Sequence, residues 1–313
     1  MNKSLTDLAS VKTLLTRFLS NLDMSYTNVT DLSPLSNCVA LITLNLWGTD
    51  VTELTPLSNC TALTVLMLGA TAVCDLIPLS KCTALTVIDL SRTGVNDLSP
   101  LANCINLKKL DLTATDVSDL SPLSKCVDLT DLNLWKTKVA NLSLLVNCTK
   151  MVIINLYGIP ATDLSPLANC VDLINLDLSV TTVVDISSLT VCTALTRLDL
   201  SYTRVTDISA LTNCIKLTIL NLEYTGVTDL SPLANCVDLS ILGLLATKVI
   251  DLSPLRNCTA MTKLELSHTN VTDIYVLTNF TKLTSLKLGN TEVSDLSPLN
   301  KLTALIHLDL WYS

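Results

Sequence analysis

The stretch that decides the fold runs from Val29 to Asp50 and reads VTDLSPLSNCVALITLNLWGTD. From Val51 the chain continues VTELTPLSNCTALTVLMLGATA, and the pattern returns from Val95 as VNDLSPLANCINLKKLDLTATD. The period is 22 residues and continues without insertion to the end, giving twelve full units and a thirteenth that begins at Val293 and stops one residue short. Self-similarity at a fixed period of roughly 20 to 50 residues is typical of stacked-repeat proteins. The 313 residues therefore predict one array rather than two ordinary domains.

Each unit contains its own secondary-structure signals. In the first full unit, residues 43–47 alternate polar and apolar side chains, which predicts a half-buried strand with Leu44 and Leu46 directed inward. Asp31 before Leu-Ser-Pro suits the start of a short helical turn, and Pro34 suits its first position because it has no N–H to lose. A 22-residue unit leaves no room for a long helix, so we expect a 3₁₀ turn.

The repeated motif is L-x-x-L-x-L-x-x-T-x-V, which the first full unit spells with Leu41, Leu44, Leu46, Thr49 and Val51. It resembles the leucine-rich-repeat family, and its length and Asp-Leu-Ser-Pro-Leu segment are most similar to the internalin-like class. The resemblance implies an α/β solenoid, a right-handed superhelix with a curved parallel β-sheet on the concave face and short 3₁₀ or turn segments on the convex face. One departure is that Thr replaces the family's ladder Asn, and we expect the Thr hydroxyls to bond neighbouring turns in its place. The Thr column contains Thr49, Thr71, Thr93, Thr115, Thr137, Thr181, Thr203, Thr225, Thr247, Thr269 and Thr291.

The predicted organisation is a single solenoid domain with distinct ends. Residues 1–28 form an N-terminal cap helix, with Ser4 as its possible N-cap, and a degenerate first repeat, whereas residues 29–313 form the thirteen repeats. No polar cap follows the last predicted strand, Leu308-Asp309-Leu310-Trp311. This uncapped edge predicts either truncation of a longer product or a homo-oligomer formed through the edge.

Composition excludes several classes of function. Hydrophobic residues make up 49% of the chain, but no run approaches the ~18 apolar residues of a membrane helix, so membrane insertion is not expected. The net charge of −8 and the lack of Lys/Arg clusters argue against nucleic acid as a partner. There are only two histidines, His268 and His307, and no partnered nucleophile or phosphate loop. We therefore expect no enzyme activity and no cofactor.

Eleven of the twelve cysteines occupy one repeat position, 22 residues apart. The last two units have Phe280 and Leu302 at that position, which indicates an apolar site and predicts buried free thiols rather than disulfides or a metal site. Cys74 stands apart and is expected to be exposed. Unpaired cysteines and the lack of a signal peptide favour a cytoplasmic protein. Several Asn-x-Ser/Thr sequons, such as the one at Asn59, keep a cell-surface or secreted location as the alternative.

Departures from the consensus on the exposed strand positions indicate where a partner binds. Eight of the nine Trp and Tyr residues lie along one band of this face, and these are the side chains that dominate interface energies. A neighbouring column is rich in Asp and would attract a basic partner, although Asp and Asn are also ordinary soluble strand residues. The predicted partner-binding residues are Trp47, Trp135, Tyr157, Arg197, Tyr202, Ile219, Glu223, Tyr224, Ile241, Leu245 and Trp311. Repeat drift is the alternative explanation of the aromatic band.

These features predict a non-enzymatic scaffold that binds a protein partner of unknown identity on its concave strand face. Two alternatives are a microbial surface or secreted adhesin-like recognition protein, as the internalin-like resemblance implies, and a self-assembling structural array.

Overall fold

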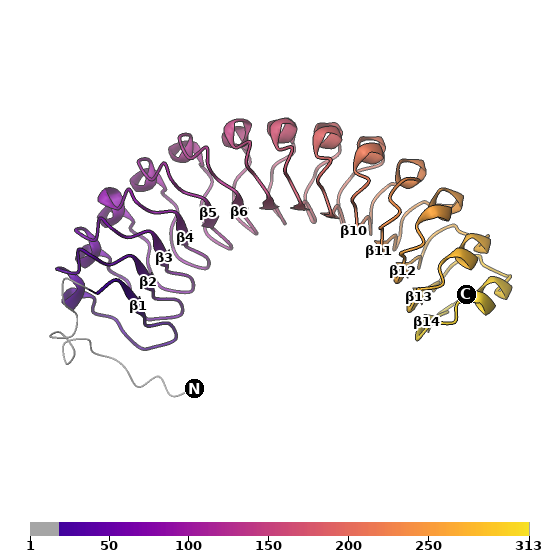
Figure 1. The fold of residues 1–313 in the computed structure, drawn as a ribbon, viewed down its shortest axis with the longest axis horizontal. Helices are drawn as coiled ribbons and strands as arrows, with labels where there is room; N and C mark the ends of the chain where they lie inside the picture. Colours follow the sequence, from indigo (N-terminus) through magenta and orange to yellow (C-terminus); the bar gives the residue numbers. More distant parts are fainter. Residues whose placement is uncertain (1–18, 313) are drawn as a thin grey trace. The chain divides into compact units, whose positions relative to one another are not determined.

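The computed structural model describes residues 19–312, which form fourteen strands of three residues each (Figure 1). The strands follow one another in sequence order in one sheet, and neighbouring strands pair in parallel from β1 to β6 and from β8 to β14. Their bounds are β1 Asn21–Asp23, β2 Thr43–Asn45, β3 Val65–Met67, β4 Val87–Asp89, β5 Lys109–Asp111, β6 Asp131–Asn133, β7 Ile153–Asn155, β8 Asn175–Asp177, β9 Arg197–Asp199, β10 Ile219–Asn221, β11 Ile241–Gly243, β12 Lys263–Glu265, β13 Ser285–Lys287 and β14 His307–Asp309.

Between consecutive strands from β1 onward lies one 3₁₀ helix of three or five residues. Their bounds are η2 Ser33–Leu35, η3 Thr55–Leu57, η4 Ile77–Lys81, η5 Ser99–Leu101, η6 Ser121–Leu123, η7 Ser143–Asn147, η8 Ser165–Asn169, η9 Ser187–Val191, η10 Ser209–Asn213, η11 Ser231–Leu233, η12 Ser253–Asn257, η13 Tyr275–Asn279 and η14 Ser297–Lys301. Within residues 19–312, no helix has the length and apolar character needed to cross a membrane. The predicted parallel sheet and 3₁₀ turns are therefore confirmed.

The chain divides into two compact units, Met1–Ile153 and Ile154–Ser313. Within each unit the strands lie along one side and the 3₁₀ helices along the other (Figure 1). Strand register is one repeat throughout, so that Leu22 pairs with Leu44 in the first unit and Leu198 with Leu220 in the second. This register stacks equivalent positions into columns, as the 22-residue period requires. The predicted cap helix lies outside the described residues, and the single-domain organisation stays a prediction.

The core consists of stacked apolar columns. In the first full unit, Val29, Leu35, Cys38, Leu41 and Leu44 are fully buried, and their equivalents are buried in every later repeat except the last, where Leu308 is 43% exposed. Because a single unit cannot bury these side chains alone, stability is built up from contacts between neighbouring repeats. The strand prediction is confirmed, because the middle residue of almost every strand is buried and its flanking residues face outward.

The predicted cysteine column is also confirmed. All eleven thiols of the column are buried and free, whereas Cys74 is exposed. Phe280 and Leu302 are buried at the same position, as expected for an apolar site. The Cys126 thiol donates to the carbonyl oxygen of Cys104 at 3.4 Å, so that the column also connects successive repeats. Burial raises the pKa of Cys104 to about 12, which keeps its thiol protonated at neutral pH.

Each 3₁₀ turn begins at an Asp-x-Ser segment or a close variant of it. The Asp31 carboxylate accepts hydrogen bonds from the Ser33 main-chain N–H at 2.7 Å and from the Ser33 hydroxyl at 2.8 Å. These two bonds lower the pKa of Asp31. Pro34 follows within the first two positions of η2, as predicted. The recurring Asp is therefore a turn-forming residue.

The threonine column corrects one expectation. The Thr49 hydroxyl donates to the carbonyl oxygen of Leu46 at 2.7 Å, three residues back in its own repeat, and the equivalents of Thr49 do the same at 2.6 to 2.9 Å. The predicted hydrogen bonds from Thr to neighbouring turns were therefore wrong. The hydroxyl is carried directly on Cβ, so it reaches its own turn rather than the next repeat. Main-chain bonds link the repeats instead, such as Tyr26 N–H to Trp47 C=O at 2.8 Å.

Candidate protein-binding surface

The outward residues of β9 to β13 form a continuous surface in the second unit, which we call the strand face. Parallel register places the first residues of these strands in one row and the third residues in a second row. The first row is Arg197, Ile219, Ile241, Lys263 and Ser285, and the second row is Asp199, Asn221, Gly243, Glu265 and Lys287. Two of the predicted apolar residues, Ile219 and Ile241, are therefore direct neighbours.

Tyr202 and Tyr224 form a stacked pair, the tyrosine pair, in the turns that follow β9 and β10. Their ring centroids are 4.4 Å apart with an interplanar angle of 17°. The side chains are 54% and 44% exposed. Both residues have left-handed backbone, with φ of 56° and 55°, a conformation that costs an L-residue free energy. Their N–H groups donate to Glu223 and Leu245 carbonyl oxygens at 2.9 and 2.8 Å, which holds the pair on the next repeat.

A hollow of about 280 Å³ lies on the strand face above Gly243, and we call it the Gly243 hollow. Ile219 and Ile241 contribute apolar lining. A Cβ at Gly243 would come within 2.7 Å of Asn221 Oδ1 and 2.9 Å of Glu223 Oε1. The only glycines with positive φ in the described chain are Gly48 and Gly158, so backbone conformation does not require glycine at position 243. Gly243 lines the hollow, and the side chains of Asn221 and Glu223 occupy the place that a Cβ at this position would take.

Three carboxylates and two ammonium groups line the hollow: Asp199, Glu223, Glu265, Lys263 and Lys287. Asp199 Oδ1 accepts a hydrogen bond from the Ser201 N–H at 2.8 Å. Glu265 accepts from the Ser267 N–H at 2.8 Å, and its other oxygen forms an ion pair with Lys287 Nζ at 2.8 Å. Two of the three carboxylates therefore already have partners.

Glu223 is the exception. Among residues 19–312 its carboxylate has no hydrogen-bond or ion-pair partner, and its side chain is only half-buried. Burial raises the pKa of Glu223, and the negative charges of Glu265 and Asp199 raise it further, against an opposing effect of Lys287. A desolvated carboxylate without a partner is destabilised in its charged form, so a cation supplied from outside would stabilise it.

The Asp-rich column, which was predicted to attract basic partners, stabilises the turns that follow the strands. Its side-chain oxygens accept hydrogen bonds from the main-chain N–H two residues later, as in Asn45 to Trp47 at 3.1 Å and Asp89 to Ser91 at 2.8 Å. These bonds close the turn after each strand. All seven acidic residues of the column accept such a bond, a role that was not predicted from the sequence. Gly243 is an exception, because it has no side chain to accept one.

The predicted aromatic residues of the first unit are engaged in local contacts. Trp47 covers Gly69, where a Cβ would come within 2.4 Å of the indole Nε1, and Trp47 also contacts Tyr26 at 4.8 Å between centroids. Lys136 Nζ lies 4.4 Å from the ring centroid of Trp135. These contacts favour a packing role for Trp47.

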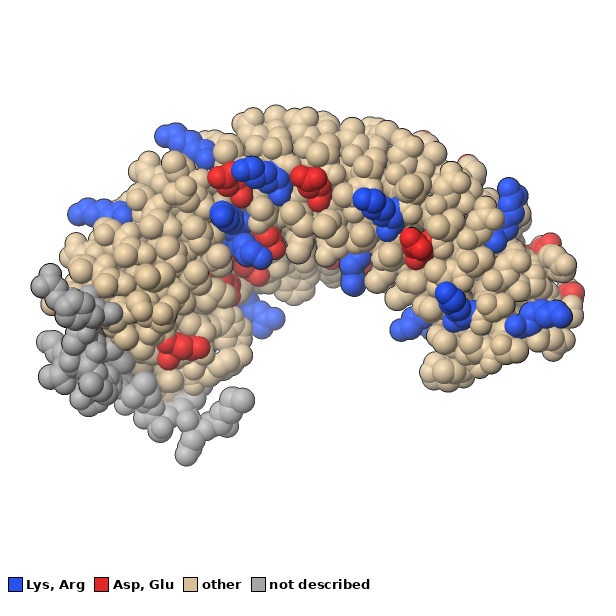
Figure 2. Space-filling model, viewed as in Figure 1, with Lys and Arg blue, Asp and Glu red and all other residues tan. Residues whose placement is uncertain are grey.

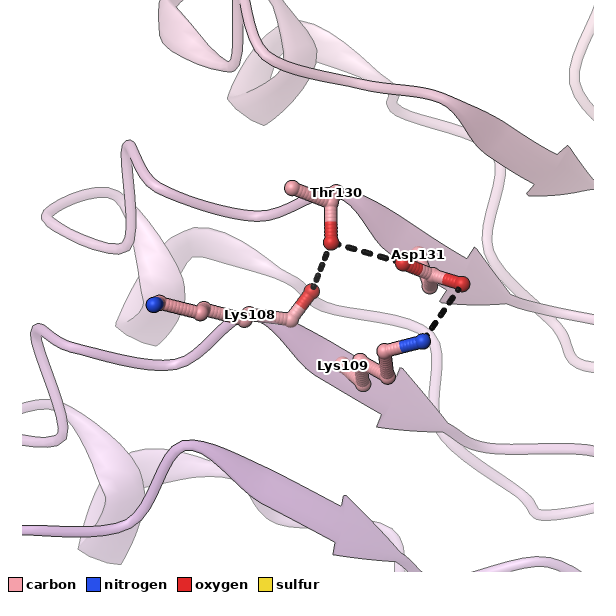
Figure 3. A network of polar contacts seen from close by, with 4 residues as sticks. All are labelled: Lys108, Lys109, Thr130 and Asp131. Atoms are coloured by element: carbon pink, nitrogen blue, oxygen red, sulfur yellow. Dashed lines mark hydrogen bonds and ion pairs between the residues drawn. The ribbon is translucent and has the colours of Figure 1, made fainter. Parts of the chain in front are cut away.

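Charged residues on the strands of the first unit also pair with each other. Lys109 on β5 forms an ion pair with Asp131 on β6 at 3.2 Å (Figure 3). The Thr130 hydroxyl bridges the Asp131 carboxylate and the Lys108 carbonyl oxygen. On the molecular face drawn in Figure 2, Lys and Arg are scattered and several lie beside Asp or Glu, without forming a large basic patch.

The remaining predicted residues lie outside the Gly243 hollow. Tyr157 is half-buried, and its N–H donates to Asn155 Oδ1 at 3.0 Å. Trp311 is 60% exposed and meets Tyr312 edge-on at 4.5 Å. The structure thus brings together Tyr202 with Tyr224 as a stack, and Ile219, Glu223 and Ile241 around the hollow.

Family models match two parts of the chain. The model described as the leucine-rich-repeat domain of the endo-beta-N-acetylglucosaminidase EndoS matches residues 3–114, and a model of two leucine-rich repeats matches residues 259–301. The structure is similar to an internalin, InlF of Listeria monocytogenes, with 28% identity and a TM-score of 0.92, covering 95% of this chain and 88% of that one. The chain therefore has an internalin-like leucine-rich-repeat fold.

Two further solved leucine-rich-repeat structures share the fold. The functional domain of InlJ from Listeria monocytogenes, which includes a cysteine ladder, has 22% identity and a TM-score of 0.76, with 97% of this chain and 69% of that chain covered. The ectodomain of the plant membrane receptor kinase GASSHO1 from Arabidopsis thaliana has 20% identity and a TM-score of 0.82, with 96% of this chain and 39% of that chain covered. No curated protein matches the sequence significantly.

Six residues that line the hollow were not among the predicted binding residues. These are Asp199, Asn221, Gly243, Lys263, Glu265 and Lys287, and all but Lys263 belong to the Asp-rich column that was expected to attract a basic partner. The available signal was Gly243 itself, the one glycine in a column otherwise dominated by Asp and Asn. Within the described residues, no group of three or more His, Cys, Asp or Glu side chains could hold a metal ion.

Proposed function

We propose that this leucine-rich-repeat protein is a non-enzymatic scaffold that binds a protein partner on the strand face of its second unit. The contact surface combines the tyrosine pair with Ile219, Ile241 and Leu245. Leucine-rich-repeat proteins of this class are protein-interaction scaffolds, and one similar structure is a plant peptide hormone receptor in complex with RGF2. The choice of the strand face of the second unit as the binding surface rests on the geometry of this chain.

The observation that carries the proposal is the stacked and exposed tyrosine pair. Stacking fixes each ring before a partner arrives, so little side-chain entropy is lost when the partner binds. Exposed tyrosines beside apolar side chains are the typical anchors of protein interfaces. In contrast, the aromatic rings of the first unit contact Gly69 or Lys136 of their own unit.

The test is affinity capture from a lysate of the source organism with two variants. Tyr202→Ala/Tyr224→Ala should lower capture of the specific partner about 10-fold or more, because removing interface anchors costs upwards of about 1 kcal/mol each. Tyr275→Ala is the matched control, because Tyr275 is 71% exposed but lies in η13, on the opposite side of the unit. A partner retained equally by both variants would place binding elsewhere.

A microbial surface or secreted adhesin-like recognition protein is the second candidate function. The similarity to InlF at a TM-score of 0.92 favours it. The similar GASSHO1 structure is the ectodomain of a membrane receptor, which favours this candidate over the cytoplasmic location predicted from cysteine usage. Detection of the protein on intact cells with an antibody would support it, and recovery solely from lysed cells would count against it.

Self-association through the last strand stays a prediction. Ile306 and Leu308 beside and within β14 are 73% and 43% exposed, so this strand presents apolar side chains. Sedimentation velocity at rising concentration tests it. A single monomeric species at the highest concentration would rule out the self-assembling array.

A further inference from the structure

We propose that the Gly243 hollow receives one lysine or arginine side chain of the protein partner. This inference rests on the proposed function, because it names the chemistry of a contact within the same strand face. Its size is the first argument. At about 280 Å³ the hollow lies at the lower limit of small-molecule sites, which span roughly 300 to 1,000 Å³, so it suits a single side chain.

The lining matches the two parts of a basic side chain. Ile219 and Ile241 offer apolar contact for the methylene stem, and lie next to each other in register on β10 and β11. Glu223 offers its carboxylate for the cationic head, with Oε1 only 2.9 Å from where a Cβ of residue 243 would lie. Basic side chains commonly bury the stem on apolar surface while the head contacts polar groups.

Charge complementarity favours a cation over an anion. Three carboxylates face two ammonium groups in the lining, and one of those ammonium groups, Lys287, is already paired with Glu265 at 2.8 Å. Lys263 is exposed and can turn toward solvent. Glu223 is therefore the charged group of the hollow that gains most from a partner, and a positive charge compensates its carboxylate more fully than a neutral donor.

Comparison with the other repeats shows that glycine at position 243 departs from the consensus and is not required by the repeat. Asn133, Asn155 and Asn221 occupy the same column, and Asn221 Oδ1 accepts the Glu223 N–H at 3.0 Å. Asn at position 243 would restore this pattern. It would also change the hollow, because its side chain must displace Asn221 Oδ1 and the Glu223 side chain, which line it. Gly243→Asn is thus a variant that alters the site while keeping the repeat.

The experiment uses a displayed library of random twelve-residue peptides panned on the full chain. Wild type is expected to enrich peptides with Lys or Arg at one shared position next to an aromatic or apolar residue. Replacing that basic residue by norleucine, which keeps the stem without the charge, should weaken binding about 10-fold in fluorescence anisotropy. Comparing Lys with Arg at that position separates the two basic side chains.

Three protein variants locate the contact. Glu223→Gln and Gly243→Asn should each abolish the preference for the basic residue, whereas Tyr275→Ala should keep it. Thermal unfolding followed by circular dichroism checks that each variant is folded. Binding should also weaken as pH falls, because the Glu223 carboxylate, which faces Asp199, Glu265, Lys263 and Lys287 in the hollow, loses its charge on protonation.

The other outcomes separate the two proposals. Peptides that lack a basic residue but need Tyr202 and Tyr224 would overturn the hollow as a basic-residue site and leave the proposed strand face standing. Peptides insensitive to the tyrosine pair, Glu223 and Gly243 would overturn both. A library that enriches no sequence on wild type would also count against both.

Discussion

Two glycines, one in each unit, occupy outward positions of the repeat but differ in the side chains that surround them. Gly69 in the first unit lies under Trp47, and a Cβ there would come within 2.4 Å of the indole Nε1. Gly243 in the second unit lines a hollow beside the ends of Asn221 and Glu223. Neither glycine has a positive φ. In both, side chains of the preceding repeat occupy the place of a Cβ, but Trp47 packs its ring on Gly69, whereas Asn221 and Glu223 leave a hollow of about 280 Å³ beside Gly243. The difference teaches that the neighbouring side chains, and not the glycine alone, decide whether the surface is hollowed.

The largest effect should come from Gly69→Asn. The new side chain must displace the Trp47 indole, and overpacking of this kind costs about 2 kcal/mol of unfolding free energy. Urea denaturation followed by tryptophan fluorescence measures it. The same substitution at Gly243 is the matched control. Equal stability of the two variants would show that the contrast between the glycines has no energetic meaning.

The next largest loss of unfolding free energy should come from removing the Trp47 side chain that packs on Gly69. Trp47→Ala loses the packing on Gly69 and the 4.8 Å contact with Tyr26. We expect a loss of about 1.5 kcal/mol in unfolding free energy, since the indole is half-buried. Trp311→Ala serves as comparison, because that ring is 60% exposed and should cost less. A larger loss at Trp311 would contradict the packing role of Trp47.

Adding a side chain at position 243 should stabilise the fold. Among residues 19–312 the Leu245 N–H has no acceptor, whereas the equivalent Glu223 N–H bonds Asn221 at 3.0 Å. Gly243→Asn supplies that acceptor and reduces the entropy of the unfolded chain, for a gain of about 1 kcal/mol. Gly243→Ala should gain less because it lacks the oxygen. Destabilisation by Asn, measured by urea denaturation, would mean that the glycine has a structural role.

The smallest effect concerns Glu223 and depends on pH. Its raised pKa means that the folded state disfavours the charged form, so the carboxyl destabilises the fold as pH rises through the folded pKa. Glu223→Gln should therefore stabilise the protein at pH 7, within about 0.5 kcal/mol. The advantage should shrink as pH falls toward the ordinary glutamate value of 4.5. An advantage that grows in acid would reverse the sign of this argument.

Much of the architecture could be predicted from the sequence because the same constraint is repeated thirteen times. Leu44 and Leu46 predict a strand with inward-facing side chains, Pro34 predicts a short turn and Cys38 predicts an apolar column. All four residues lie in the predicted elements. The prediction was wrong for a polar group whose hydrogen-bond partner the repeat pattern does not determine. The Thr49 hydroxyl bonds the Leu46 carbonyl oxygen rather than a neighbouring turn.

The candidate site was predicted only in part. Tyr202, Tyr224, Ile219, Glu223 and Ile241 were identified as departures from the consensus, and the structure groups them on one face. The period alone fixes which positions face outward, because residues one repeat apart stand in register.

The sequence by itself determined the repeat, its register and the buried columns, since these depend on local patterning copied along the chain. Only the tertiary structure decided which outward residues are free to bind. Trp47 was predicted to bind a partner and Gly243 was not, yet Trp47 packs on Gly69 and Gly243 lines a hollow. That outcome depends on contacts between adjacent repeats, which sequence periodicity aligns but whose packing it does not specify.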